Sequence, residues 1–137
     1  MRILIADDSD LVRMRLVDML SDLEGIETIF EAQEGQEAIQ LTRKLRPDVV
    51  ILDIRMPKRN GLEVMSEIVQ ENYNPVIIIL TNYPQDQYRK RCMEAGSDYF
   101  FDKSCEFERV TEICKQLVGS SESIKRQVNG GAVRNGG

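Results

Sequence analysis

The sequence predicts an α/β fold, a doubly wound parallel sheet built from five β/α units. Three apolar runs carry this prediction, Ile3 to Ala6, Val49 to Leu52 and Val76 to Leu80, and the last two lack the polar alternation of a half-exposed strand. Such runs are typical of strands buried on both faces. Between them, apolar side chains recur every three or four residues, the spacing of amphipathic helices. Regular alternation of strand and helix favours a parallel sheet, because right-handed crossovers place helices on both of its faces.

Four of the expected helices are recognised by side chains that share this helical spacing. The inward positions are Val12, Leu16, Met19 and Leu23 in the first helix, Ala38, Leu41, Thr42 and Leu45 in the second, Met65, Ile68 and Val69 in the third, and Phe107, Val110, Cys114 and Leu117 in the fifth. The fourth helix is expected to begin near Pro84, and the fifth to run from about Glu106 to Val118. Gly25 and Gly96 follow helical patterns, as glycines at helix C-termini do.

Two weaker strands, Thr28 to Ala32 and Asp98 to Phe101, complete the predicted sheet. With the strand order 2-1-3-4-5 the fold is flavodoxin-like, and the order of the strands reverses between strands 1 and 3. Ligands of such sheets bind in the crevice outside the carboxyl ends of the strands at that point. We therefore expect the functional site there.

A single domain accounts for most of the 137 residues. We expect it to span residues 1–119, since the composition after Gly119 changes to Ser, Asn, Gly and isolated charges that cannot bury a core. Residues 120–137 are predicted to form a flexible C-terminal tail without an output domain. A short helical extension around Ser123 to Val128 is the alternative.

The composition excludes several classes of function. The 18 basic and 23 acidic residues give a net charge of −5, which argues against direct binding to nucleic acid. No N-terminal apolar stretch is long enough for a signal peptide or a membrane span, and the 3 cysteines lack CxxC spacing. These features favour a cytoplasmic protein without membrane insertion. Because histidine is absent, Ser/His or Cys/His catalysis, a histidine phosphocarrier and most zinc enzymes are excluded.

Polar side chains follow four of the predicted strands. Asp7 and Asp8 follow the first, Asp53 the third, Thr81 the fourth and Lys103 the fifth. Three crowded carboxylates would repel one another and raise their pKa values unless a cation neutralised them. Ligands that are all oxygen suit Mg²⁺, with Mn²⁺ as an alternative.

A carboxylate in such a site can act as a nucleophile toward phosphorus and form an aspartyl phosphate. The metal, the Lys103 ammonium and the Thr81 hydroxyl could then neutralise the oxygens of the transferred group. A structural interpretation stands beside this one. Asp7, Asp8 and Asp10 could merely cap the following helix, and Thr81 and Lys103 could be ordinary surface groups.

The motifs that hold these residues resemble those of response-regulator receiver domains of bacterial two-component systems. They are Ala6-Asp7-Asp8-Ser9, Asp53-Ile54-Arg55-Met56-Pro57, Asn60-Gly61, Leu80-Thr81 and Phe101-Asp102-Lys103. The resemblance covers Met1 to Val118. It implies that Asp53 is the phosphoacceptor, that Mg²⁺ is bound by Asp8, Asp53 and the backbone carbonyl of Arg55, and that Asp7 helps through water.

The resemblance also implies roles around this acceptor. Thr81 and Lys103 would contact the phosphoryl group, and Thr81 and Phe100 would switch the conformation. Arg55 and Tyr83, two residues past the acceptor and past Thr81, would tune the lifetime of the phosphate by shielding it from water. One departure is Ser104, which stands where the family usually has a proline, often after a cis bond; a cis bond before serine would cost about 2.5–4 kcal/mol.

By this resemblance the chain is a stand-alone, chemotaxis-regulator-like signalling protein rather than a turnover enzyme. A histidine kinase or histidine phosphotransfer protein would supply the phosphoryl group. A downstream target would bind the face formed by the fourth helix, fifth strand and fifth helix. The alternatives are a phosphorelay shuttle, a phosphate sink, and an interaction module that no longer accepts phosphate. An Asp-nucleophile phosphatase ranks last, because such enzymes carry the acceptor after the first strand.

Overall fold

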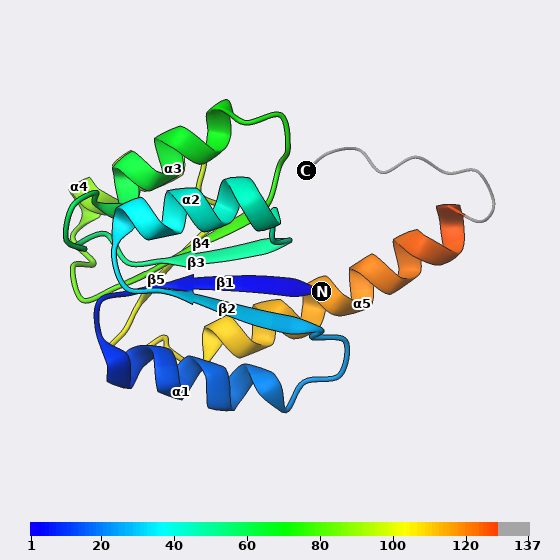
Figure 1. The fold of residues 1–137 in the computed structure, drawn as a ribbon. Helices are drawn as coiled ribbons and strands as arrows, with labels where there is room; N and C mark the ends of the chain where they lie inside the picture. The colour runs from blue at the N-terminus through cyan, green and yellow to red at the C-terminus, as the bar shows by residue number, and fades with distance from the viewer. Residues whose placement is uncertain (129–137) are drawn as a thin grey trace.

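The computed structural model describes the backbone of residues 1–128 and the side chains of residues 1–120. The strands are β1 (Arg2–Ala6), β2 (Thr28–Ala32), β3 (Val49–Leu52), β4 (Val76–Thr81) and β5 (Tyr99–Asp102). The helices are α1 (Asp10–Ser21), α2 (Gly35–Leu45), α3 (Gly61–Gln70), α4 (Asp86–Ala95) and α5 (Arg109–Val128). All strand pairs are parallel and the order is β2-β1-β3-β4-β5, so the predicted (βα)5 doubly wound, flavodoxin-like fold is confirmed (Figure 1).

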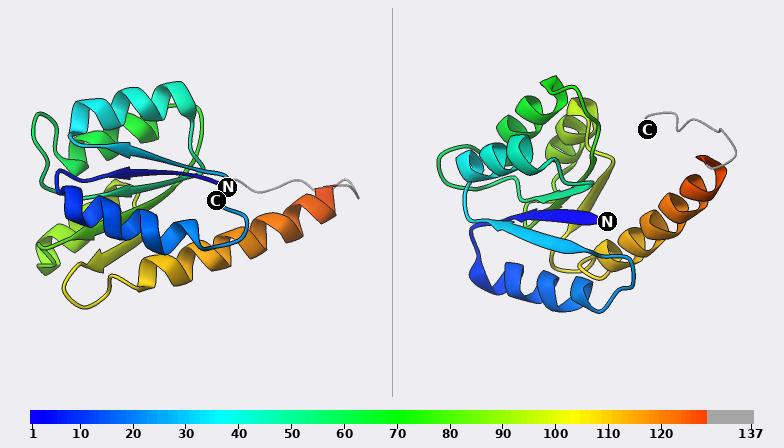
Figure 2. Two further views of the ribbon diagram at one scale, coloured as in Figure 1. Left: turned by 60° about the horizontal axis from the view of Figure 1, so that its bottom comes forward. Right: turned by 45° about the vertical axis from the view of Figure 1, so that its right-hand side comes forward.

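The sheet separates two apolar cores (Figures 1 and 2). Side chains alternate along each strand, so that Leu4 packs with α2, α3 and α4 while Ile3 and Ile5 pack with α1 and α5. All of β3 is buried, as its uninterrupted apolar run predicted. No helix in the described part of the chain has the length and apolar content needed to span a bilayer.

The helix faces differ from the predicted ones at several positions. In α1 the buried side chains are Arg13, Leu16 and Leu20, and the predicted Val12, Met19 and Leu23 are partly buried against the same core. Arg13 fills a position that hydrophobicity alone leaves outside. Val69 is 52% exposed, because Met65 and Ile68 already face the sheet and the next residue turns about 100° away. α1 ends at Ser21, so Gly25 does not cap it; the Gly25 carbonyl instead accepts a hydrogen bond from the N-terminal amine.

The last helix begins later and runs further than predicted. It starts at Arg109 rather than Glu106, because the segment before it is folded into turns. It continues to Val128 and projects past the sheet (Figure 2), so the predicted domain boundary at residue 119 falls inside it. Residues 129–137 of the predicted tail lie outside the described residues.

The start of α2 packs against the loop that follows β3. The Gly35 N–H donates to the Pro57 carbonyl at 3.2 Å, and a Cβ atom on Gly35 would lie 1.8 Å from the Arg59 carbonyl oxygen. Similarly, a Cβ on Gly61 would lie 2.2 Å from the Asp53 carbonyl oxygen. The chain after Asp53 can therefore take this course only because both positions are glycine and leave room for the backbone.

The Gly35 packing predicts opposite effects of alanine at two helical glycines. Gly35→Ala should lower the free energy of unfolding by about 1–3 kcal/mol, because backbone must move to admit the Cβ. Gly119→Ala is the control, since nothing lies within 4 Å of its Cβ position; helix propensity should leave its stability unchanged or raise it by up to about 1 kcal/mol. Urea unfolding measures both, and equal values would contradict the packing argument.

Candidate functional site

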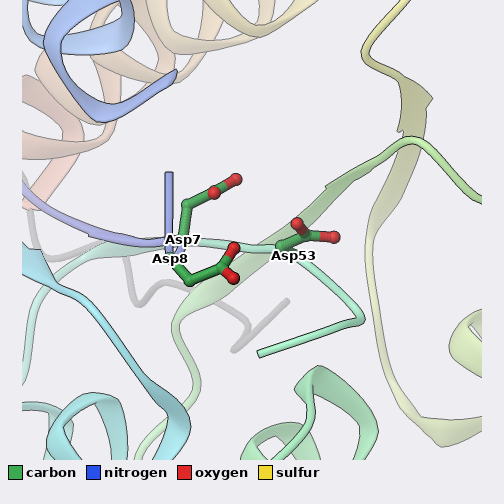
Figure 3. Close-up of side chains that lie close together, drawn as sticks. All are labelled: Asp7, Asp8 and Asp53. Carbon is green, nitrogen blue, oxygen red and sulfur yellow. The ribbon is translucent and has the colours of Figure 1, made fainter. Parts of the chain in front are cut away.

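Three carboxylates lie at the carboxyl edge of two neighbouring strands. Asp7 and Asp8 follow β1 and Asp53 follows β3, and these strands pair in register. One oxygen of each carboxylate lies within 4.8 Å of the others (Figure 3). Asp7 and Asp53 are buried, whereas Asp8 is exposed. The structure thus brings together the three acidic residues that the sequence singled out.

Helix capping does not account for these carboxylates. The N-cap of α1 is Ser9, whose side chain accepts a hydrogen bond from the Val12 N–H at 3.3 Å. Asp7 Oδ1 accepts from the Ser9 N–H at 2.8 Å, but its other oxygen faces the site. Asp8 and Asp53 make no contact with the helix terminus that the described hydrogen bonds record. The structural interpretation is therefore weaker than the chemical one.

Lys103 reaches into the acidic cluster from the loop after β5. Its Nζ lies 2.7 Å from Asp7 Oδ2 and 2.8 Å from Asp53 Oδ2, and its side chain is 8% exposed. Burial alone would lower the pKa of Lys103, but the hydrogen bonds and charges of Asp53 and Asp7 outweigh burial and raise it. Burial raises the pKa of Asp7, and the bonds from Lys103 and Ser9 only partly offset this. One ammonium therefore compensates two buried carboxylates.

Asp53 Oδ1 is buried, and none of the described residues offers it a hydrogen-bond partner. A buried acceptor without a partner costs about 1–3 kcal/mol, and more when it is charged. A cation at Oδ1 would remove this cost. The neighbouring atoms that could bind a metal are all oxygen. Mg²⁺ prefers oxygen ligands, so the residues present fit a magnesium ion.

Thr81 lies on β4, which pairs with β3, and Phe100 lies on β5, which pairs with β4. Thr81 is fully buried at the end of β4, and its hydroxyl accepts from the Tyr83 N–H at 3.1 Å. Phe100 is buried against α4, where the Arg89 guanidinium lies 4.7 Å from its ring centroid. The described hydrogen bonds of the Thr81 side chain reach neither Asp53 nor Lys103. The structure thus places Thr81 at the carboxyl end of β4 and Phe100 one strand further along the sheet, on β5.

Arg55 and Tyr83 contact each other. The Arg55 guanidinium lies 4.2 Å from the Tyr83 ring centroid. A hydrogen bond with Tyr88, and then the interactions with Tyr83, raise the pKa of Arg55. The two residues predicted to tune the lifetime therefore form one unit that joins the loop after β3 to the segment before α4.

Arg13 is a site residue that the sequence pattern did not reveal. Its buried guanidinium donates to the Asp7 carbonyl, to the Asp10 carboxylate and, at 3.2 Å, to Glu31. It thereby ties α1 and β2 to the chain that carries the first two carboxylates. The signal that could have found it is its position three residues before Leu16, on the buried face of a helix that follows an acidic motif.

The fold and site together define a doubly wound α/β domain with an acidic, lysine-bridged site at the carboxyl edge of its parallel sheet. The model of the response regulator receiver domain matches residues 3–115. The chain belongs to this family, whose members are the receiver domains of two-component signalling and interact with histidine kinases and downstream partners.

Individual relatives agree with this assignment. The response regulator GacA of Pseudomonas aeruginosa is 30% identical over 127 residues, which cover 93% of this chain and 59% of that protein. The transcriptional regulatory protein PdtaR of Mycobacterium tuberculosis is 43% identical over 96 residues, 70% of this chain and 46% of that protein. A chain of the CheX–CheY–BeF3–Mg²⁺ complex from Borrelia burgdorferi superposes with a TM-score of 0.77 at 28% identity, covering 85% of this chain and 87% of that one. The chain thus spans about half the length of the curated relatives it matches.

The Arg13 contacts predict that this residue supports metal binding. Arg13→Lys keeps the charge but loses the planar fork that reaches three acceptors, so the first two carboxylates should lose their fixed position. We expect Mg²⁺ affinity, measured by titration calorimetry, to fall about tenfold, the lower end of the effect of losing a residue that orients metal ligands. Arg43→Lys is the control, since Arg43 pairs with Glu67 and Glu71 on the surface. Equal affinities in the two variants would refute this role.

Proposed function

We propose that the chain accepts a phosphoryl group on Asp53 in a magnesium-dependent reaction and signals through the resulting change in conformation. The observation that carries this proposal is the buried, unpartnered Oδ1 of Asp53. Its other oxygen, Oδ2, contacts Lys103 at 2.8 Å, so Asp53 can offer Oδ1 to a magnesium ion and Oδ2 to the phosphorus atom. Family membership supports the same chemistry.

Asp8, Asp53 and the backbone carbonyl of Arg55 would hold Mg²⁺ directly, and Asp7 would hold it through water. When bound, the ion supplies positive charge to the carboxylates and to the oxygens of the incoming phosphoryl group. Lys103 would bind a second phosphoryl oxygen and the Thr81 hydroxyl a third. As the bond from Asp53 to phosphorus forms, the bond from phosphorus to the donor's imidazole nitrogen breaks, and the imidazole keeps that electron pair.

The donor would be a histidine kinase or a histidine phosphotransfer protein, as family membership suggests, and its histidine would lie in that protein, since none occurs among these 137 residues. The phosphoryl group adds about 1.5–2 negative charges. Thr81 would turn toward them and Phe100 would follow, which shifts the population toward a conformer of the α4, β5 and α5 face that binds a target. Arg89, which contacts both the ring of Phe100 and its carbonyl, lies on this path.

Phosphorylation of Asp53 is tested directly by mass spectrometry. The chain incubated with acetyl phosphate and Mg²⁺ should gain one phosphoryl group, and peptide mapping should place it on Asp53. Asp53→Asn and removal of Mg²⁺ with EDTA should both abolish the gain, whereas Asp18→Asn, an exposed carboxylate of α1, should not. A phosphoryl group retained by Asp53→Asn would exclude this acceptor.

The contact between Arg55 and Tyr83 leads to a prediction about how fast the phosphoryl group is lost from Asp53. Both side chains would shield the acyl phosphate from water, so Arg55→Ala and Tyr83→Ala should each speed its loss about tenfold, or about 1.4 kcal/mol, within the range of a cation–π contact. The double variant should be no faster than either single one, since the pair acts as a unit.

The control for the lifetime is Arg46→Ala. This change removes a similar contact, in which the Arg46 guanidinium lies 4.9 Å from the Tyr73 ring centroid. Arg46 is the C-cap residue of α2. Its phosphate should decay at the wild-type rate in the same assay. Additive effects of Arg55→Ala and Tyr83→Ala would show that the two side chains shield the phosphate separately.

A further inference from the structure

A single closed turn carries Lys103. It runs from Asp102, the last residue of β5, to Glu106, and the Asp102 carbonyl accepts from the N–H groups of Glu106 at 2.7 Å and Cys105 at 3.3 Å. Two side chains add further hydrogen bonds across the same turn. Asp102 Oδ1 accepts from the N–H of Ser104 at 2.9 Å and from its hydroxyl at 2.7 Å. Glu106 Oε1 accepts from the Asp102 N–H at 3.2 Å, in the reverse direction.

This turn fixes the backbone on both sides of the lysine. The Lys103 N–H donates to the Thr81 carbonyl at 2.9 Å, which ties the same residue to β4. From this anchored position the side chain reaches Asp7 and Asp53. A lysine side chain has many rotamers, and holding its ammonium in one place is costly in entropy. A rigid backbone at its base limits the positions that the ammonium can reach.

We propose that Asp102 and Glu106 are positioning residues for phosphoryl transfer, which hold the ammonium of Lys103 at the acceptor Asp53. This inference rests on the proposed function. A proline after the lysine would restrict the backbone through its ring. Ser104 does not, and here the two carboxylates restrict the backbone through their hydrogen bonds. The Lys103–Ser104 bond is trans, as are all peptide bonds of the described residues.

The charge state of Asp102 agrees with this role. The hydrogen bonds from the Ser104 hydroxyl and N–H lower the pKa of Asp102. The group is therefore an ionised acceptor at neutral pH. An acceptor of this kind makes stronger hydrogen bonds than a neutral one.

The test measures two quantities on the full chain: the rate of phosphorylation by acetyl phosphate at saturating Mg²⁺, and Mg²⁺ affinity by calorimetry. Asp102→Ala and Glu106→Ala should each slow phosphorylation about tenfold, within the roughly 100-fold that a 1 Å misplacement can cost. Mg²⁺ affinity should be unchanged, since neither residue is near the proposed ligands of the ion. A parallel loss of metal affinity would indicate general loosening of the site and overturn the proposal.

Conservative variants separate the hydrogen bonds from the charges. Asp102→Asn and Glu106→Gln keep an acceptor oxygen and should slow phosphorylation less than the alanine variants do. Glu108→Ala is the matched control, because this exposed carboxylate lies in the same segment and no hydrogen bond or ion pair of its side chain is recorded among the described residues. Ser104→Ala removes only the hydroxyl contact and should give a smaller slowing, which keeps the test open if Asp102→Ala does not fold.

A double-mutant cycle decides whether Asp102 acts through Lys103. In a Lys103→Ala background, Asp102→Ala should cause no further slowing. The same tenfold slowing in both backgrounds would overturn the inference. A wild-type chain that gains no phosphoryl group on Asp53 would overturn the proposed function and this inference together, whereas normal phosphorylation of both the wild type and Asp102→Ala would overturn the inference alone.

Discussion

Repulsion among Asp7, Asp8 and Asp53 is the constraint on which the site depends. Like charges about 4 Å apart repel by roughly 1–4 kcal/mol at effective dielectric constants between 80 and 20, and two of these three carboxylates are buried. Among the described residues, Lys103 is the cation whose ammonium contacts both buried carboxylates. One oxygen of Asp53 has no hydrogen-bond partner among the described residues, so the cluster can still accept a cation.

The parallel sheet satisfies this constraint by supplying each group from a different element. β1 and β3 bring the carboxylates together, α1 contributes Arg13, and the turn after β5 contributes Lys103. Each group is then anchored away from the site. Arg13 is fixed by three acceptors, and the turn after β5 is closed by its own carboxylates. The side chains of such a site are therefore held in place partly by contacts outside the acidic cluster, and the site can be rigid.

The fold and the clustering of the acidic residues could be predicted because they depend on backbone regularity. Uninterrupted apolar runs such as Val49–Leu52 mark buried strands, and the carboxyl ends of parallel strands meet at one edge, so Asp7, Asp8 and Asp53 had to lie close together. The spacing of Arg13 to Leu16 places it on the buried face of α1, but its contacts could not be predicted, since a buried guanidinium depends on acceptors that only the fold brings within reach. The predicted start of α5 was wrong because Glu106 is a residue that helices readily accept. In the structure its side chain instead accepts a hydrogen bond from the Asp102 N–H and closes the turn before the helix.

The crowding of carboxylates around Lys103 also bears on the proposed switch. A phosphoryl group on Asp53 would bring further negative charge to an ammonium that already serves two carboxylates, so the contacts of Lys103 must be redistributed. The Lys103 N–H is bonded to the Thr81 carbonyl, and Phe100 lies on the same strand as the lysine turn. A shift of the lysine would be opposed by the closed turn, so the proposed response would pass instead to Thr81 and Phe100. Both side chains are buried, Thr81 bonded to the Tyr83 N–H and Phe100 packed against Arg89, and these contacts would have to yield for the face of α4 and β5 to change.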